Sequence, residues 1–210
     1  MSTARTAGTG SDRRAELLAI AASLFAERGL RATTVRDIAD AAGILSGSLY
    51  HHFDSKESMV DEILREFLDA LFTDYRAIVA AGRPPRATLE VLVAASFEAM
   101  RTRREAVAIY QNEARRLVGQ PPFGYIRERN EEFRTLWFAL LRDGMADGSF
   151  RPDLDVELVF RFLRDTVWVG VGWFRPNRAF DAQQVARQYL QIVLDGIAVP
   201  RRPARRPATS

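Results

Sequence analysis

The chain has 210 residues, 47% hydrophobic and 27% charged, enough to bury a core in one large or two small domains. It contains no cysteine and only two histidines, the adjacent His51 and His52, which excludes a disulfide scaffold, a cysteine-based metal site and a histidine metal cluster. The net charge is +3 and Lys56 is the single lysine, so the basic side chains are almost all arginines, which is compatible with nucleic acid but not diagnostic of it.

The spacing of apolar residues is helical along almost the whole chain and predicts an all-α fold. No apolar run approaches the ~20 residues that cross a bilayer, and the start lacks a signal peptide's apolar core, so we expect a cytoplasmic protein. Residues 1–10 and the Pro/Arg-rich residues 200–210 are expected to be tails. Between them we predict three short helices and then six longer ones, at about 11–28, 34–42, 45–53, 55–78, 86–103, 105–118, 125–146, 155–174 and 181–198.

Turn and capping signals support these boundaries. Gly29 follows the first helix, as expected for a residue in the left-handed region, and Thr34-Val-Arg-Asp37 has the form of a capping box. Asp54-Ser55 is expected to cap the fourth helix, and Asp153 and Asp155 offer caps for the eighth.

The helices at 34–42 and 45–53, joined by a short turn at Gly43, form a pattern typical of a helix-turn-helix. The second of them carries polar side chains that can reach base edges or phosphates in a major groove. Other polar residues lie at helix starts, where backbone N–H groups favour phosphate. An ordinary helical hairpin with a solvated surface explains the same pattern. The candidate DNA-binding residues are Thr34, Arg36, Ser46, Ser48, Tyr50, His51, His52 and Lys56.

Four longer segments favour the DNA-binding interpretation, because together they form a pattern known from DNA-binding domains. They are Ala21-Ala-x-Leu-Phe-Ala-Glu-Arg-Gly29, Thr33-Thr-Val-Arg-Asp-Ile-Ala39, Ala42-Gly-Ile44 and Gly47-Ser-Leu-Tyr-His-His-Phe-Asp-Ser-Lys-Glu57. Over residues 11–60 the chain resembles the N-terminal domain of the TetR family of transcriptional regulators. Leu45 and Ser46 depart from that pattern, where a capping serine and a basic residue are frequent. The resemblance implies a nine-helix architecture, with a helix-turn-helix domain at 11–57 and a ligand-binding and dimerisation domain at 58–199. It also implies a homodimer on double-stranded DNA with a palindromic operator.

The predicted helix at 155–174 is apolar around most of its circumference, so it needs partners on two sides. The resemblance implies that it builds the dimer interface together with the last helix. One face differs, because Arg161, Arg164, Asp165, Trp168 and Gly172 recur at spacings of three and four. A solvated face with ion pairs explains the charges, whereas Trp168 beside arginine suits an anionic, partly apolar ligand.

Further matches lie in the second half: Ala95-Ser-Phe-Glu-Ala99, Ile109-Tyr-Gln-x-Glu-Ala-x-Arg-Leu117, Phe150-Arg-Pro-Asp-Leu-Asp-Val156 and Arg161-Phe-x-Arg-Asp-Thr-x-Trp168. They resemble TetR-type repressors of actinobacterial cholesterol catabolism that control degradation of the last steroid rings. This resemblance implies no cofactor, and an effector that is a CoA thioester of the indanedione propionate left after the first rings are removed. If the residue roles of those repressors are carried over to this chain, Arg164 is expected to bind an acidic or carbonyl part of the effector and Trp168 to pack on its rings. Tyr110, Glu113 and Arg116 are further candidates on the facing helix, and Trp137 and Phe138 fit either core or pocket wall.

Three functions other than an effector-released repressor are compatible with parts of the sequence. An enzyme is disfavoured because the chain lacks a nucleophile elbow, a phosphate-binding loop and a dinucleotide fingerprint, and both histidines lie in the expected recognition helix. A DNA-binding dimer without a ligand needs no pocket, so Arg164 and Trp168 are structural in that case. A regulator of the same family that responds to another acyl-CoA or a lipophilic molecule keeps the DNA-binding role and changes only the effector.

Overall fold

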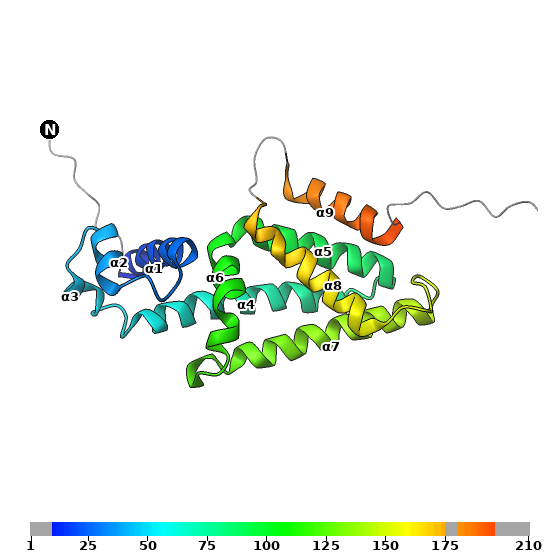
Figure 1. Cartoon of the computed structure of the whole chain (residues 1–210), viewed down its shortest axis with the longest axis horizontal. Helices are drawn as coiled ribbons and strands as arrows, with labels where there is room; N and C mark the ends of the chain where they lie inside the picture. Colours follow the sequence, from blue (N-terminus) through cyan, green and yellow to red (C-terminus); the bar gives the residue numbers. More distant parts are fainter. Residues whose placement is uncertain (1–9, 175–179, 196–210) are drawn as a thin grey trace, which may run out of the picture.

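The computed structural model describes residues 10–174 and 180–195, and every regular element in these ranges is helical (Figure 1). Within that part of the chain, no helix is long and apolar enough to cross a membrane. The predicted tail over 200–210, residues 1–9, and the end of the last helix at 198 lie outside the described residues. The α-helices are α1 (Gly10–Arg28), α2 (Val35–Ala41), α3 (Ser46–Leu49), α4 (Lys56–Ala80), α5 (Pro85–Thr102), α6 (Arg104–Leu117), α7 (Tyr125–Ala146), α8 (Val156–Trp168) and α9 (Ala182–Leu190).

Helices α1, α2 and α3 form a small head at one end of the molecule (Figure 1). Its core is built from apolar positions of all three helices, where Phe25, Ile38 and Leu49 are almost completely buried. Gly29 ends α1 with a φ of 82°, and Thr34 caps α2 in the expected capping box with Asp37. The head therefore follows directly from the caps and apolar spacing of its sequence.

The prediction for the third helix was too long. Helix α3 covers one turn, and residues 50–52 continue as turns rather than helix. It begins at Ser46 with Leu45 at the cap position, where no side chain accepts a hydrogen bond. The helix ends where the N–H groups of His52 and Phe53 both donate to the Leu49 carbonyl, at 3.0 and 3.1 Å.

Helix α4 connects the head to the rest of the molecule. It begins at the capping residue Ser55 and runs for 25 residues, out of the head and along the larger helical body (Figure 1). Its buried side carries apolar side chains in every turn, from Met59 to Tyr75. The same helix thus packs against the head at its start and lines the interior of the body further along.

The body consists of α4 to α9 around an aromatic core. Phe133 of α7 lies 6.4 Å from Phe72 and 5.8 Å from Tyr75 of α4, and 5.8 Å from Phe160 of α8, all between ring centroids. Helix α9 packs on α5, so α5 lies between α9 and the rest of the body. Burial of these large side chains is the main stabilising contribution to the body.

The eighth helix is shorter than the predicted range of 155–174. The α-helix stops at Trp168 and continues as a 3-10 turn over Val169–Gly172, after which the N–H of Trp173 donates to the Gly170 carbonyl at 3.1 Å. Two glycines in four residues lower helix propensity enough to explain the change. Gly170 faces Phe97 and Met100 of α5, where a Cβ would lie 3.5–3.7 Å from their side chains, at ordinary van der Waals distance.

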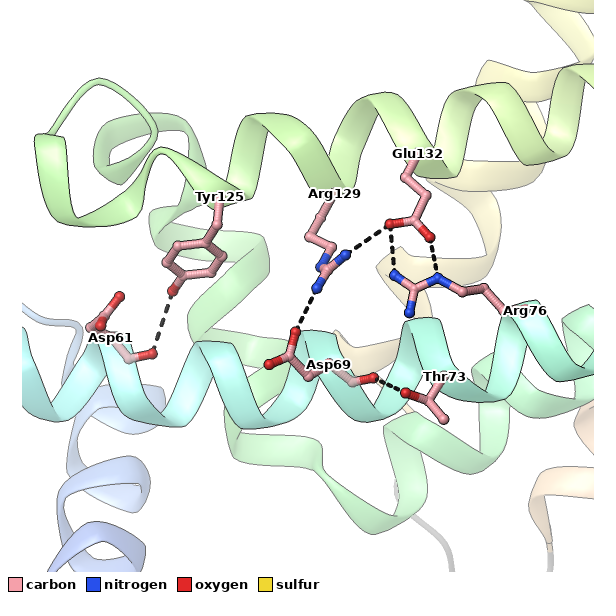
Figure 2. A network of polar contacts seen from close by, with 7 residues as sticks. All are labelled: Asp61, Asp69, Thr73, Arg76, Tyr125, Arg129 and Glu132. Atoms are coloured by element: carbon pink, nitrogen blue, oxygen red, sulfur yellow. Dashed lines mark hydrogen bonds and ion pairs between the residues drawn. The ribbon is translucent and has the colours of Figure 1, made fainter.

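An ionic network joins α4 to α7 along one edge of the body (Figure 2). Arg129 of α7 contacts Asp69 at 2.7 Å and Glu132 at 2.9 Å, and Glu132 accepts a hydrogen bond at 2.6 Å from Arg76 of α4. Nearer the head, the Tyr125 hydroxyl donates to the Asp61 carbonyl. The network fixes how α7 lies on α4, beside the cavity described below.

Candidate DNA-binding surface and effector pocket

The outer surface of the head carries most of the candidate DNA-binding side chains. Tyr50 is 56% exposed, the Arg36 side chain is 84% exposed, and His51 is exposed beside them. Ser46, Ser48 and His52 are half-buried. Arg36 makes one long ion pair, 3.7 Å to Asp40, which leaves its guanidinium accessible. The head therefore presents hydroxyl, imidazole and guanidinium groups outward from α2, α3 and the turn after α3, as the prediction required.

Thr34 and Lys56, by contrast, already bond within the head. The Thr34 hydroxyl donates to the Asp37 carboxylate at 2.6 Å, and this bond lowers the pKa of Asp37. The Lys56 ammonium donates to the carbonyls of Leu30 at 2.8 Å and Thr33 at 3.1 Å. An ammonium has three donors, so one N–H of Lys56 remains for another acceptor. Thr34 thus caps α2 as expected, whereas Lys56 holds the loop between α1 and α2 in place, a role that the sequence did not reveal.

A cavity of about 410 Å³ lies between α4, α6, α7 and α8. This volume is within the range of small-molecule sites in proteins. Its apolar walls come from aromatic and aliphatic side chains of all four helices, and its polar groups come from α6, α7 and α8. The lining residues are Phe67, Leu68, Leu71, Phe72, Tyr110, Gln111, Ala114, Arg115, Val118, Asn130, Glu131, Phe133, Arg134, Phe160, Arg164, Asp165 and Trp168.

The predicted residues Arg164, Trp168 and Tyr110 all line this cavity. Trp168 is buried and meets Phe67 edge to face, with the ring centroids 6.3 Å apart. The Tyr110 hydroxyl donates to Asn130 at 2.5 Å, and burial raises the pKa of Tyr110 to about 12, so it stays a neutral donor. The half-buried Arg164 pairs with Asp165 at 2.6 Å, which raises the pKa of its guanidinium. The cavity thus combines aromatic walls with three guanidinium groups, those of Arg115, Arg134 and Arg164.

Two predicted ligand residues do not reach the cavity. Glu113 and Arg116 lie on the opposite face of α6, where Glu113 accepts a hydrogen bond from the Leu30 N–H of the head. They pair with each other at 2.9 Å. Arg161 also points away and pairs with Glu157 at 2.6 Å. Glu113 and Arg116 therefore do not lie with Arg164 and Trp168 in this cavity, because the turn of α6 directs Glu113 toward the head.

Most residues of the cavity wall were not among the candidates that the sequence suggested. The contributions of α4 and α7, such as Phe67, Phe133 and Arg134, sit in stripes that read as ordinary core or solvent face. On α6, Ala114 and Val118 follow Tyr110 at helical spacing, and this periodicity is the signal that could have identified them. Trp137 is core and Phe138 is partly buried, and neither lines the cavity.

Apolar side chains on α8 and the segment after it remain exposed in the isolated chain. Leu158, Phe162, Val169 and Trp173 recur at intervals of four, seven and four residues, and each is at least 51% exposed. Ile192 and Val193 after α9 are 46% and 40% exposed. A row of large apolar side chains on one face is typical of an interaction surface.

Comparisons with known proteins agree with this geometry. A family model described as bacterial regulatory proteins, tetR family, matches residues 17–63, and one described as a tetracyclin repressor-like C-terminal domain matches residues 82–197. The transcriptional repressor KstR2 of Rhodococcus jostii is 67% identical over 90% of this chain and 93% of its own. The solved structure of the ketosteroid transcriptional regulator KstR2 of Mycobacterium tuberculosis has a TM-score of 0.86 and 60% identity, covering 91% of this chain and 98% of that one. The chain therefore belongs to the tetR family of bacterial regulatory proteins, as a DNA-binding transcriptional regulator and not an enzyme.

Proposed function

We propose that this protein represses genes for the breakdown of steroid rings and leaves its operator when a CoA thioester binds. The relatives named as KstR2 repressors are 58–67% identical over about nine-tenths of the chain, including the cavity-bearing part. The observation that carries the proposal is the cavity itself, in which Arg164 and Trp168 lie one turn apart on α8. As a regulator of bacterial genes, it acts in the cytoplasm.

The cavity chemistry supports a ligand that is part ring system and part anion. Phe67, Phe72 and Trp168 offer flat apolar surfaces for fused rings. The Arg164 guanidinium can bond a carbonyl or carboxylate on those rings or on the thioester arm. A volume of about 410 Å³ fits the ring part of an indanedione-propionyl thioester, with the nucleotide end outside. No cofactor has a role in this scheme.

On the DNA side, Ser46, Ser48, Tyr50, His51 and His52 contact base edges and phosphates in the major groove. Thr34, Arg36 and the free N–H of Lys56 contact the flanking backbone. The exposed apolar row on α8, with the end of α9, forms the interface of a homodimer. The two heads then reach major grooves ~34 Å apart on a palindromic operator.

The test is operator binding at fixed salt, because phosphate contacts make affinity depend steeply on salt. Fluorescence anisotropy with DNA from upstream of the gene would be measured while the indanedione-propionyl thioester or free CoA is added. We expect release by the thioester and not by CoA. Arg164→Met and Trp168→Leu should bind operator normally and resist release. Arg161→Met is the matched control, since Arg161 lies on the same helix outside the cavity and should leave release unchanged.

Each alternative has its own outcome in this experiment. Release by a different acyl-CoA or by a lipophilic compound, lost in Trp168→Leu, replaces the effector and keeps the site. Operator binding that no small molecule changes indicates a ligand-independent DNA-binding dimer. Loss of release in Arg161→Met to the same degree as in Arg164→Met would contradict the assignment of Arg164.

A further inference from the structure

The loop between α1 and α2 is held from two sides by charged side chains of other helices. On one side, Lys56 at the start of α4 bonds the carbonyls of Leu30 and Thr33. On the other side, the Leu30 N–H donates to Oε1 of Glu113 at 3.1 Å. Lys56 belongs to the helix that leaves the head, whereas Glu113 belongs to α6 of the body. The hydrogen bond from Leu30 to Glu113 thus links the head to the effector domain.

The loop geometry explains why Leu30 needs this acceptor. Gly29 takes the left-handed conformation that ends α1, and its own N–H donates to the Phe25 carbonyl at 2.9 Å. The next N–H, that of Leu30, has no helical carbonyl within its reach, and the Leu30 side chain is 2% exposed. A buried N–H without a partner is costly, so the carboxylate of Glu113 completes the end of α1.

Glu113 is itself held rigidly. Its side chain is 13% exposed, and its second oxygen accepts a hydrogen bond at 2.9 Å from Arg116 one turn along α6. Nη2 of Arg116 is buried and has no partner among the described residues. Side chains fixed in this way transmit a displacement of the helix backbone rather than absorbing it by changing rotamer.

Helix α6 therefore contacts both functional parts of the molecule. Tyr110, Ala114 and Val118 on one face line the cavity, and Glu113 on the opposite face bonds the head. An effector that shifts α6 to make room for itself also moves the acceptor of the Leu30 N–H. The loop that Glu113 holds leads directly into α2 and the recognition turn.

We propose that Glu113 is a positioning residue that couples effector binding to DNA binding through its hydrogen bond to the Leu30 N–H. The proposal rests on the effector-released DNA binding proposed above. Coupling between two sites is reciprocal, so the same bond must also carry the effect of operator DNA back to α6. This reciprocal effect is measurable without any effector.

The sharpest comparison uses two double variants that differ only in the acceptor. Glu113→Gln with Arg116→Met keeps an oxygen for the Leu30 N–H and removes both charges. Glu113→Ala with Arg116→Met removes the oxygen as well. Asn112→Ala is the matched control, an exposed neighbour on α6 that lies outside the cavity. Glu113→Asp, which keeps the charge but withdraws the oxygen by one methylene, replaces the alanine variant if that one fails to fold.

Two readouts are taken on each variant. The first is the ratio of operator dissociation constants with and without the indanedione-propionyl thioester. The second is amide hydrogen exchange in peptides from residues 105–118, with and without operator DNA. We expect the alanine or aspartate variant to bind thioester and operator separately, but with its ratio reduced about fivefold or more. Operator DNA should also no longer change exchange in α6. The glutamine variant and the control should behave as wild type.

Other outcomes would overturn the proposal. If the alanine and glutamine variants keep the wild-type ratio and exchange response, the bond carries no coupling. If the alanine and glutamine variants both lose the wild-type ratio and exchange response, the coupling depends on the charges and not on the hydrogen-bond acceptor. If the thioester fails to release even wild-type protein, the proposed effector is wrong. In that case the hydrogen-exchange measurement alone tests the role of Glu113. Operator DNA must then change amide exchange in α6 of the glutamine variant and not of the alanine variant.

Discussion

The buried pair of Tyr75 and Ser96 allows a quantitative test of the core. Tyr75 of α4 and Ser96 of α5 are 0% and 1% exposed, and their hydroxyl oxygens lie 2.5 Å apart. Ser96 donates its proton to the Leu92 carbonyl at 2.8 Å, so Tyr75 is the donor between the two hydroxyls. Burial raises the pKa of Tyr75, which keeps its phenol protonated.

The two single deletions should therefore have unequal costs. Tyr75→Phe removes one hydrogen bond while Ser96 still donates to Leu92, so we expect a loss of about 1 kcal/mol in the free energy of unfolding. Ser96→Ala leaves the buried Tyr75 hydroxyl without a partner, and we expect a loss of about 2 kcal/mol or more. In a chain of this size each kcal/mol corresponds to a shift of about 2–4 °C in Tm.

Urea and thermal unfolding followed by circular dichroism would measure both losses at one fixed protein concentration, because the homodimer proposed above would make the apparent stability depend on concentration. The double variant closes the cycle and should lose little more than Tyr75→Phe, since the orphaned hydroxyl is gone. If Tyr75→Phe costs as much as Ser96→Ala, the assignment of donor and acceptor is wrong.

Three further results are expected. Arg76 and Arg129 lower the pKa of Glu132, so the stability from this carboxylate is present above pH 4.5 and lost as pH falls through its folded pKa. Glu132→Gln should therefore lower the free energy of unfolding by about 1 kcal/mol or less near neutral pH, and by less in acid. A cost in urea unfolding that does not change with pH would contradict this expectation. Arg36→Ala should lower the slope of log affinity for operator against log salt by about one, and an unchanged slope would mean that Arg36 contacts no phosphate. Burial raises the pKa of Tyr110 from 10.0 to about 12, so its neutral phenol favours the folded state below pH 10 and that contribution is lost between pH 10 and 12. Tyr110→Phe should lose less stability than wild type over that range, and parallel curves would argue against burial as the cause.

Helix α6 illustrates which features of the site can be predicted from the sequence and which cannot. Its existence and bounds followed from apolar spacing, and Tyr110 was correctly expected at the pocket. Its side chains advance about 100° per residue, which places Glu113 and Arg116 about 130° and 170° from the centre of the cavity-lining face. Their separation from the pocket was thus implicit in the helix period, but only once the pocket face was known.

Other features depend on contacts that no local pattern encodes. The Lys56 ammonium bonds carbonyls 26 and 23 residues earlier in the chain. Phe67 and Phe133 line the cavity from α4 and α7, although both residues occupy positions that read as ordinary core. Local propensity fixed helix starts such as Ser55 and Tyr125 well, and it failed at α3 and at the end of α8, where capping groups are missing or glycines intervene.

Because Lys56 is the single lysine, its bonds to Leu30 and Thr33 make the protein a one-site chemical reporter. The free amine is the group that attacks thioesters and other acylating reagents, so Lys56 must leave both carbonyls and lose a proton before it reacts. Every acylated side-chain amine would then record one release of the loop between α1 and α2. The rate of labelling at this position, followed by mass spectrometry of the intact chain, measures how often that loop opens in the free protein and on DNA.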